Sequence, residues 1–315
     1  MTGKVITLSG GVGGAKLVLG LSHIVMGGDL VVACNTGDDF DHLGLRVCPD
    51  IDSILYSLSG LSDQQRGWGR RDETWTFMSA LGDLKAPIWF NLGDGDLATH
   101  VFRSDLLRQG QLLGAVTAEL ALRLGITATI CPMSDDPVAT IVQTPEGELA
   151  FQHYFVREQC KPSVTGFRFE GLNTASLNGT VADALNDNPR AIIIAPSNPY
   201  VSVDPILHIP GMMDALIAAD APIVAVSPIV GGQALKGPAA KMMAELGIDV
   251  SVLGIARHYH ELLDGLIIDQ IDANLAPKIE AMGLKVHVTQ TIMSDLKSRI
   301  DLASATLAFT NELAQ

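Results

Sequence analysis

Short apolar runs recur along the chain, and longer stretches with helical spacing of apolar positions separate many of them. Several runs are apolar on both faces, which is typical of strands buried in a parallel sheet. The alternation predicts an α/β fold with a Rossmann-like, doubly wound and mostly parallel sheet. We expect strands within residues 4–10, 29–36, 87–93, 127–134, 191–198, 222–228, 249–256, 265–269 and 285–291, and helices within 14–26, 104–123, 211–219, 236–246 and 295–312.

One segment departs from this alternation. The sequence ATIVQTPEGELAFQHYFV, residues 139–156, contains two alternating runs joined by Pro-Glu-Gly, a pattern that predicts a β-hairpin. We therefore place a smaller inserted lobe at about 135–180. The whole chain, 1–315, is interpreted as a single Rossmann-like domain that carries this lobe.

Composition narrows the class of protein. Of the 315 residues, 47% are hydrophobic, which is ample for a folded core. The 35 acidic and 21 basic side chains give a net charge of −14, which argues against general nucleic-acid binding. No run reaches the roughly 18 to 20 apolar residues of a membrane span. The four cysteines lack C-x-x-C spacing, so we expect reduced thiols in a cytoplasmic protein with no nucleic-acid or membrane partner.

A glycine-rich loop, SGGVGGAKL at residues 9–17, follows the first expected strand and leads into the first expected helix. Glycines let the backbone approach a phosphate, and the helix start offers free N–H groups. The loop is not a Walker A motif, because Ala15 precedes Lys16 and Leu17 follows it. Lys16 also occupies the third glycine position of the dinucleotide fingerprint. The loop indicates an anion without identifying it, and a glycine turn for close strand–helix packing is the alternative.

Carboxylates gather after the second expected strand, in NTGDDFDHLGLRVCPDIDSILYSL at residues 35–58. Taken alone, they are explained by helix caps and surface charge. Beside a phosphate-binding loop, however, such a cluster repels itself unless a cation lies there, and Mg²⁺ prefers carboxylates together with phosphate oxygens. The combination predicts metal-assisted chemistry on a phosphate ester or anhydride. The aspartates are Asp38, Asp39, Asp41, Asp50 and Asp52.

Arginines and tryptophans are interleaved in RGWGRRDETWTFM, residues 66–78. Guanidinium groups bind phosphates or carboxylates, and an exposed indole stacks on a planar ring. An amphipathic helix start with surface arginines is the alternative. In LGDGDLATHVFRSDLL, residues 92–107, His100 is a candidate base or a packed histidine.

Taken together, these stretches resemble a known family. GGVGGAKL, the aspartate segment, RGWGRRDETW, LGDGDLATH, APSNPYVSVDPIL and SPIVGG.ALKGPA occur in this order between residues 9 and about 240. They are similar to the 2-phospho-L-lactate transferase family of coenzyme F-420 biosynthesis, often called CofD or FbiA. The resemblance is weaker after about residue 260.

The resemblance implies a Mg²⁺-dependent transferase with a Rossmann-like fold, typically a homodimer. Its donor is a phosphorylated three-carbon acid linked to GMP through a diphosphate, and its acceptor is the ribityl hydroxyl of the deazaflavin Fo. GMP leaves. The acid is 2-phospholactate, phosphoenolpyruvate or 3-phosphoglycerate, and the sequence does not identify which.

The resemblance also implies site residues. Asp38 and Asp50 match the family positions for Mg²⁺. The candidate catalytic residues are Asp38, Asp39 and Asp50, because they cluster, and one of the three is expected to be the base for the attacking hydroxyl. The deazaflavin site takes Thr36, Asp50, Arg66, Trp68, Asp94, Thr99 and His100. The donor's nucleotide and phosphates are bound by Gly10, Gly11, Gly13, Gly14, Lys16, Ser197, Asn198, Ser202, Ser227 and Lys236.

Two other functions remain. One is a non-catalytic nucleotide-binding regulator of the same superfamily, from a branch linked to gluconeogenesis, which shares the glycine loop but is not expected to carry RGWGRRDETW with GDGDLATH. The other is a nicotinamide oxidoreductase. Asn35 and Thr36 stand where that class has an acidic ribose ligand, which argues against it.

Overall fold

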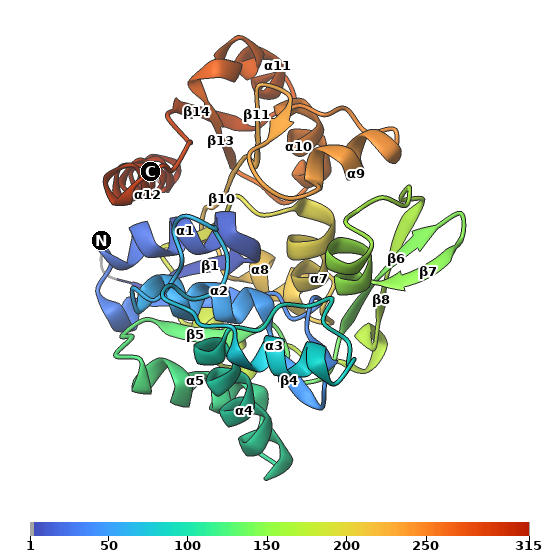
Figure 1. The fold of residues 1–315 in the computed structure, drawn as a ribbon. Helices are drawn as coiled ribbons and strands as arrows, with labels where there is room; N and C mark the ends of the chain where they lie inside the picture. Colours follow the sequence, from blue (N-terminus) through green and yellow to red (C-terminus); the bar gives the residue numbers. More distant parts are fainter. Residues whose placement is uncertain (1–2, 315) are drawn as a thin grey trace.

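Seven parallel strands form the central sheet of the computed structural model, which describes residues 3–314 (Figure 1). Their order is β14-β13-β10-β9-β1-β2-β5, so the chain winds outward in both directions from β1. This confirms the α/β doubly wound prediction and seven of its expected strands. The strands are β1 (Val5–Ser9), β2 (Leu30–Cys34), β5 (Thr129–Pro132), β9 (Ala191–Ile194), β10 (Ile223–Val226), β13 (Gly265–Asp269) and β14 (Lys285–Thr289).

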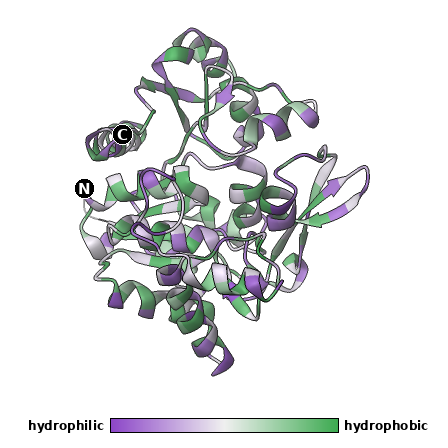
Figure 2. Ribbon diagram, in the orientation of Figure 1, coloured by the Kyte–Doolittle hydropathy of each residue, from purple (hydrophilic) through white to green (hydrophobic). Residues whose placement is uncertain are grey.

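Helices cover both faces of this sheet, because alternate strand residues enter two separate cores. Val5 packs into the core with α1, α2, α5 and α12, whereas Ile6 and Leu8 pack into the core with α6, α8 and α10. Figure 2 shows hydrophilic residues toward the outer end of α4. The helices are α1 (Gly11–Ser22), α2 (Pro49–Leu58), α3 (Thr76–Asp83), α4 (Asp94–Arg108), α5 (Leu113–Arg123), α6 (Gly179–Asn186), α7 (Asp204–Leu207), α8 (Met212–Ala218), α9 (Ala239–Glu245), α10 (Val252–Tyr259), α11 (Ala276–Glu280) and α12 (Leu296–Leu313).

Two expected strands are wrong. Residues 249–256 lead into α10, which Ser251 caps by accepting a hydrogen bond from the Leu253 N–H at 3.1 Å. Most of this helix is buried, so its apolar run resembles that of a buried strand. Residues 87–93 pair with no strand. Their aromatic residues pack instead on the small hairpin formed by β3 (Phe40–His42) and β4 (Leu45–Val47), where the Phe90 and Phe40 ring centroids are 4.9 Å apart.

Small antiparallel elements lie outside the central sheet. The hairpin expected at 139–156 is present, but its second strand ends at Ala150 and a π-helical turn, His153–Arg157, follows. A third strand joins it, and the division at about 135–180 stays an interpretation. The helix expected at 104–123 is two helices, α4 and α5. The antiparallel strands are β3 (Phe40–His42), β4 (Leu45–Val47), β6 (Ala139–Thr144), β7 (Gly147–Ala150), β8 (Gly166–Glu170), β11 (Ile229–Val230) and β12 (Gln233–Ala234).

The two ends of the chain meet where α12 packs on α1 (Figure 1). A Cβ atom on Gly20 would overlap the backbone carbonyl of Arg299 and lie 3.1 Å from the Ala303 Cβ. Only glycine allows the two helix backbones this approach. The packing therefore fixes the position of α12 on the helix that follows the glycine loop.

Over residues 3–314 no single helix has the length and apolar character needed to cross a bilayer. The segments Pro199–Leu207 and Met212–Ala218 reach that length and apolar character only as a pair, and the pair is bent by 77°.

Candidate functional site

The glycine loop joins the carboxyl end of β1 to α1, beside the loops that follow β2 and β9. The Gly10 N–H donates to the Ser197 Oγ at 3.2 Å, and that hydroxyl donates to the Gly10 carbonyl at 2.7 Å. A Cβ atom on Gly13 would overlap the Pro196 carbonyl, and one on Gly14 would overlap the Ser9 Oγ. Close packing therefore explains Gly13 and Gly14 structurally, and a phosphate-binding role for them remains a prediction.

Asp50, at the start of α2, is bound to this loop. Its Oδ1 accepts the Gly11 N–H at 2.6 Å, and its Oδ2 accepts the Asn35 amide at 2.9 Å. The same amide donates to the Val201 carbonyl at 3.2 Å. Asp50 is thus an anion at the amino end of α1, where backbone N–H groups favour negative charge. A Cβ on Gly10 would lie 2.6 Å from the Ser202 Cβ, so Ser202 also borders this point.

Asp38, Asp39 and Asp50 are all buried, and the charges of Asp39 and Asp50 both act on Asp38. Burial raises the pKa of Asp39 to about 7 and that of Asp50 to about 6. Burial, followed by repulsion from Asp50, raises the pKa of Asp38 well above its usual range. The Asp38 Oδ1 and both Asp39 carboxylate oxygens have no hydrogen-bond partner within residues 3–314. Buried carboxylates without partners are costly, so this cluster favours protons or a bound cation.

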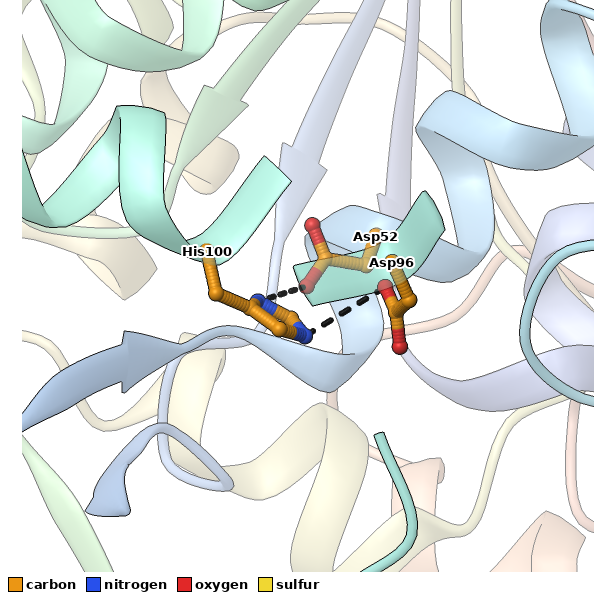
Figure 3. Close-up of side chains that lie close together, drawn as sticks. All are labelled: Asp52, Asp96 and His100. Carbon is orange, nitrogen blue, oxygen red and sulfur yellow. Dashed lines mark ion pairs between the residues drawn. The ribbon is translucent and has the colours of Figure 1, made fainter. Parts of the chain in front are cut away.

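A second acidic cluster lies between α2 and α4, with His100 between Asp52 and Asp96 (Figure 3). The His100 Nδ1 is 3.7 Å from the Asp52 Oδ2, and its Nε2 is 3.3 Å from the Asp96 Oδ1. Three ligand atoms of these residues lie within 4.8 Å of one another, a spacing that a metal ion can bridge. However, the buried Arg103 already binds both oxygens of Asp52. This cluster is therefore supplied with its own cation.

A cavity of about 110 Å³ lies where α1, α2 and the loop at 62–69 meet. Three predicted binding residues, Lys16, Trp68 and Lys236, line it. The Lys16 ammonium donates to the Met293 carbonyl at 3.1 Å. The Arg66 guanidinium lies over the rings of Trp68 and Trp75, at 5.5 and 5.1 Å from their centroids. The structure thus places Trp68 together with the predicted phosphate-binding lysines.

Other predicted site residues have local structural partners. Asp94, which starts α4 rather than following a strand, accepts from the Thr74 hydroxyl at 2.6 Å and the Phe77 N–H at 3.0 Å. Asn198 accepts from the Tyr200 N–H, and the Ser227 Oγ donates to the Ile229 carbonyl at 2.9 Å. Thr36, Thr99 and His100 are buried. Their ligand roles stay predictions.

Three residues of these clusters were not predicted to have a functional role. Arg103 binds Asp52 across 51 positions of the chain, and Asn35 joins the β2 end to Asp50 across 15. Arg299, which lines the same cavity as Lys16, comes from α12. No local sequence pattern marks such partners, because each is a single residue in an ordinary helix or loop. Only Asn35 had a recognisable signal, because it directly follows a strand and ligand sites lie at the carboxyl ends of parallel strands.

The doubly wound sheet, the glycine loop at a helix start and the buried carboxylates at the strand ends define a class: α/β proteins that bind phosphorylated ligands. The chain also matches the family model "2-phospho-L-lactate transferase CofD" over residues 5–300. It therefore belongs to the CofD family.

Relatives with this family's activities align along nearly the whole chain. It is 42% identical to a 2-phospho-L-lactate transferase of Methanococcoides burtonii, an alignment that covers 95% of this chain and 96% of the relative. It is 36% identical to a phosphoenolpyruvate transferase of Kitasatospora aureofaciens, covering 98% of both. A UPF0052 family protein of Bacillus halodurans has a similar fold, with a TM-score of 0.62, 14% identity and coverage of 98% and 99%.

Proposed function

We propose that the chain transfers a phospho-acid group from a GMP-diphosphate-activated donor to the ribityl hydroxyl of Fo, releasing GMP, in coenzyme F-420 biosynthesis. The acid is 2-phospholactate, phosphoenolpyruvate or 3-phosphoglycerate. Membership of the CofD family supports this function. The observation that carries it is the group of buried carboxylates, next to the start of α1, whose oxygens include three without a hydrogen-bond partner among residues 3–314.

Mg²⁺ fits this carboxylate group better than it fits the second cluster. Asp38 has a buried oxygen without a partner, and its repulsion with Asp50 is relieved by a cation between them. Asp52, in contrast, already has Arg103. We therefore assign Mg²⁺ to Asp38 and Asp50. A bound Mg²⁺ supplies charge stabilisation to the phosphate oxygens during transfer.

The remaining residues orient the two substrates. Asp39, whose pKa is raised to about 7 by burial, is suited to accept the proton of the attacking hydroxyl near neutral pH. Lys16 and Lys236 attract the donor's diphosphate. Trp68 is 47% exposed, so its ring offers a stacking face for the deazaflavin. The Arg66 guanidinium already lies over this ring, which supports stacking on it.

A competition reaction tests the proposal. The purified chain is mixed with Mg²⁺, Fo and the three guanylylated donors at equal concentration, and the product masses are read by mass spectrometry. One dominant mass is expected, and it identifies the acid. No product from any donor, with Fo shown to be stable, contradicts the proposal and favours the nucleotide-binding regulator. The same preparation, examined by light scattering, tests the homodimer that the family implies.

A further inference from the structure

The cavity where α1, α2 and the loop at 62–69 meet is lined by three cationic side chains from distant parts of the chain. Lys16 comes from α1, Lys236 from the loop before α9, and Arg299 from α12. A volume of about 110 Å³ holds several water molecules or one phosphate group. Clustered cations repel one another, so a cavity built this way favours an anion.

Within the described part of the chain, the cations of this cavity have no carboxylate in direct contact, although the charge of Asp295 acts on Arg299. Over residues 3–314, none of the three makes an ion pair within 4.0 Å, and the carboxylate of Asp63, which also lines the cavity, is held by Arg66 at 2.7 Å. Burial lowers the pKa of Lys16, and the charges of Lys236 and Arg299 lower it further. The three cations therefore repel one another across the cavity, and a bound anion would relieve that repulsion.

Arg299 is the buried member of this group. Arg299 is only 5% exposed, and its Nη2 donates a hydrogen bond to the Gln64 Oε1 at 2.5 Å. Its Nε is buried and has no hydrogen-bond partner among the described residues. A buried guanidinium with an unused donor is costly unless a ligand completes its bonds, and its planar fork matches phosphate oxygens.

We propose that this cavity is a phosphate-binding site and that Arg299 binds one phosphate of the donor's diphosphate. The proposal rests on the proposed function. Ser53 lines the cavity and lies three residues after Asp50 on α2, a rise of about 4.5 Å. The cavity and the carboxylates are therefore bordered by the same turn of α2, so a donor held at the carboxylates would bring its diphosphate next to the cavity. The C-terminal helix thereby becomes part of the substrate site.

Inorganic pyrophosphate alone, titrated into the full-length chain by isothermal titration calorimetry at low ionic strength, tests this site. We expect Arg299→Gln to weaken pyrophosphate binding about tenfold or more, because a charge-assisted hydrogen bond is lost. The matched control is Lys297→Gln, which removes the same charge from an exposed position of α12. It should leave the Kd within about twofold of wild type.

Lys236→Gln provides a second variant, because Lys236 is exposed and its loss is not expected to impair folding. Circular dichroism checks the fold of each. The proposal is overturned if the wild-type chain does not bind pyrophosphate. It is also overturned if Lys236→Gln and every folded Arg299 variant bind pyrophosphate with the same Kd as the control Lys297→Gln. If pyrophosphate binding depends on Arg299 but no donor yields product, the phosphate site stands and the proposed function fails.

Discussion

The molecule contains two buried acidic clusters, close in sequence, that balance their charge in opposite ways. Asp52 is paired with the Arg103 guanidinium, and the Asp96 carboxylate lies 3.3 Å from the His100 imidazole; both partners are part of the fold. Asp38, Asp39 and Asp50 form no ion pair within 4.0 Å among residues 3–314, and burial raises the pKa of each, although the charges of Arg46 and Arg103 lower that of Asp39. The first arrangement is complete in the protein alone. The charge of the second arrangement is balanced only when protons or a cation are bound. A site that acts on phosphates needs such a place for a cation.

Removing the cation of the complete cluster should have the largest effect. Arg103→Met leaves Asp52 buried and unpaired, and we expect a loss of about 3–5 kcal/mol in the free energy of unfolding, measured with urea. The double variant Asp52→Leu with Arg103→Met should recover most of that loss. A loss below about 1 kcal/mol in the single variant would mean that Arg103 does not balance this cluster.

Neutralising the other cluster should affect turnover rather than stability. Asp38→Asn keeps the shape but removes a Mg²⁺ ligand, so we expect phospho-acid transfer to fall about a hundredfold or more. The free energy of unfolding at pH 8 should not decrease, because the buried carboxylate has no cationic partner in the protein. Near-normal turnover would remove Asp38 from the metal site.

Asp39 should give the protein a pH-dependent stability. Its folded pKa, about 7, exceeds the unfolded value of 3.8, so the folded state retains a proton that the unfolded state has released. The retained proton stabilises the folded state, and its contribution to the free energy of unfolding is full below about pH 4 and is lost as the pH rises to about 7. Without added Mg²⁺, Asp39→Asn should therefore be more stable than wild type by about 1 kcal/mol or more at pH 8. Equal unfolding curves at pH 8 would contradict this.

The smallest effect is expected at Asp41, which belongs to the same stretch of sequence. Its carboxylate is exposed and lies 3.4 Å from the Arg46 guanidinium. Asp41→Asn should change the free energy of unfolding by less than about 0.5 kcal/mol and leave turnover unchanged. A large loss of turnover would extend the reaction site to the β3–β4 hairpin.

The sequence predicted the sheet and the first carboxylate cluster because both depend on local patterns. Buried parallel strands are apolar on both faces, and loops after strands share one edge of the sheet. It failed at 249–256, where a buried helix has the same apolar run as a strand. It also failed at Arg103 and Arg299. Their partners lie far along the chain, and only the folded structure brings them together.

The close packing of α12 on α1 at Gly20 has a consequence for how the protein is made. A ribosome that adds roughly 5–20 residues per second needs roughly 14–55 s to pass from the end of α1 at Ser22 to the start of α12 at Leu296. During that time the apolar face of α1 lacks its partner helix. A nascent chain cut short before residue 296 leaves that face uncovered, and exposed apolar surface of this kind makes an incomplete chain prone to aggregation.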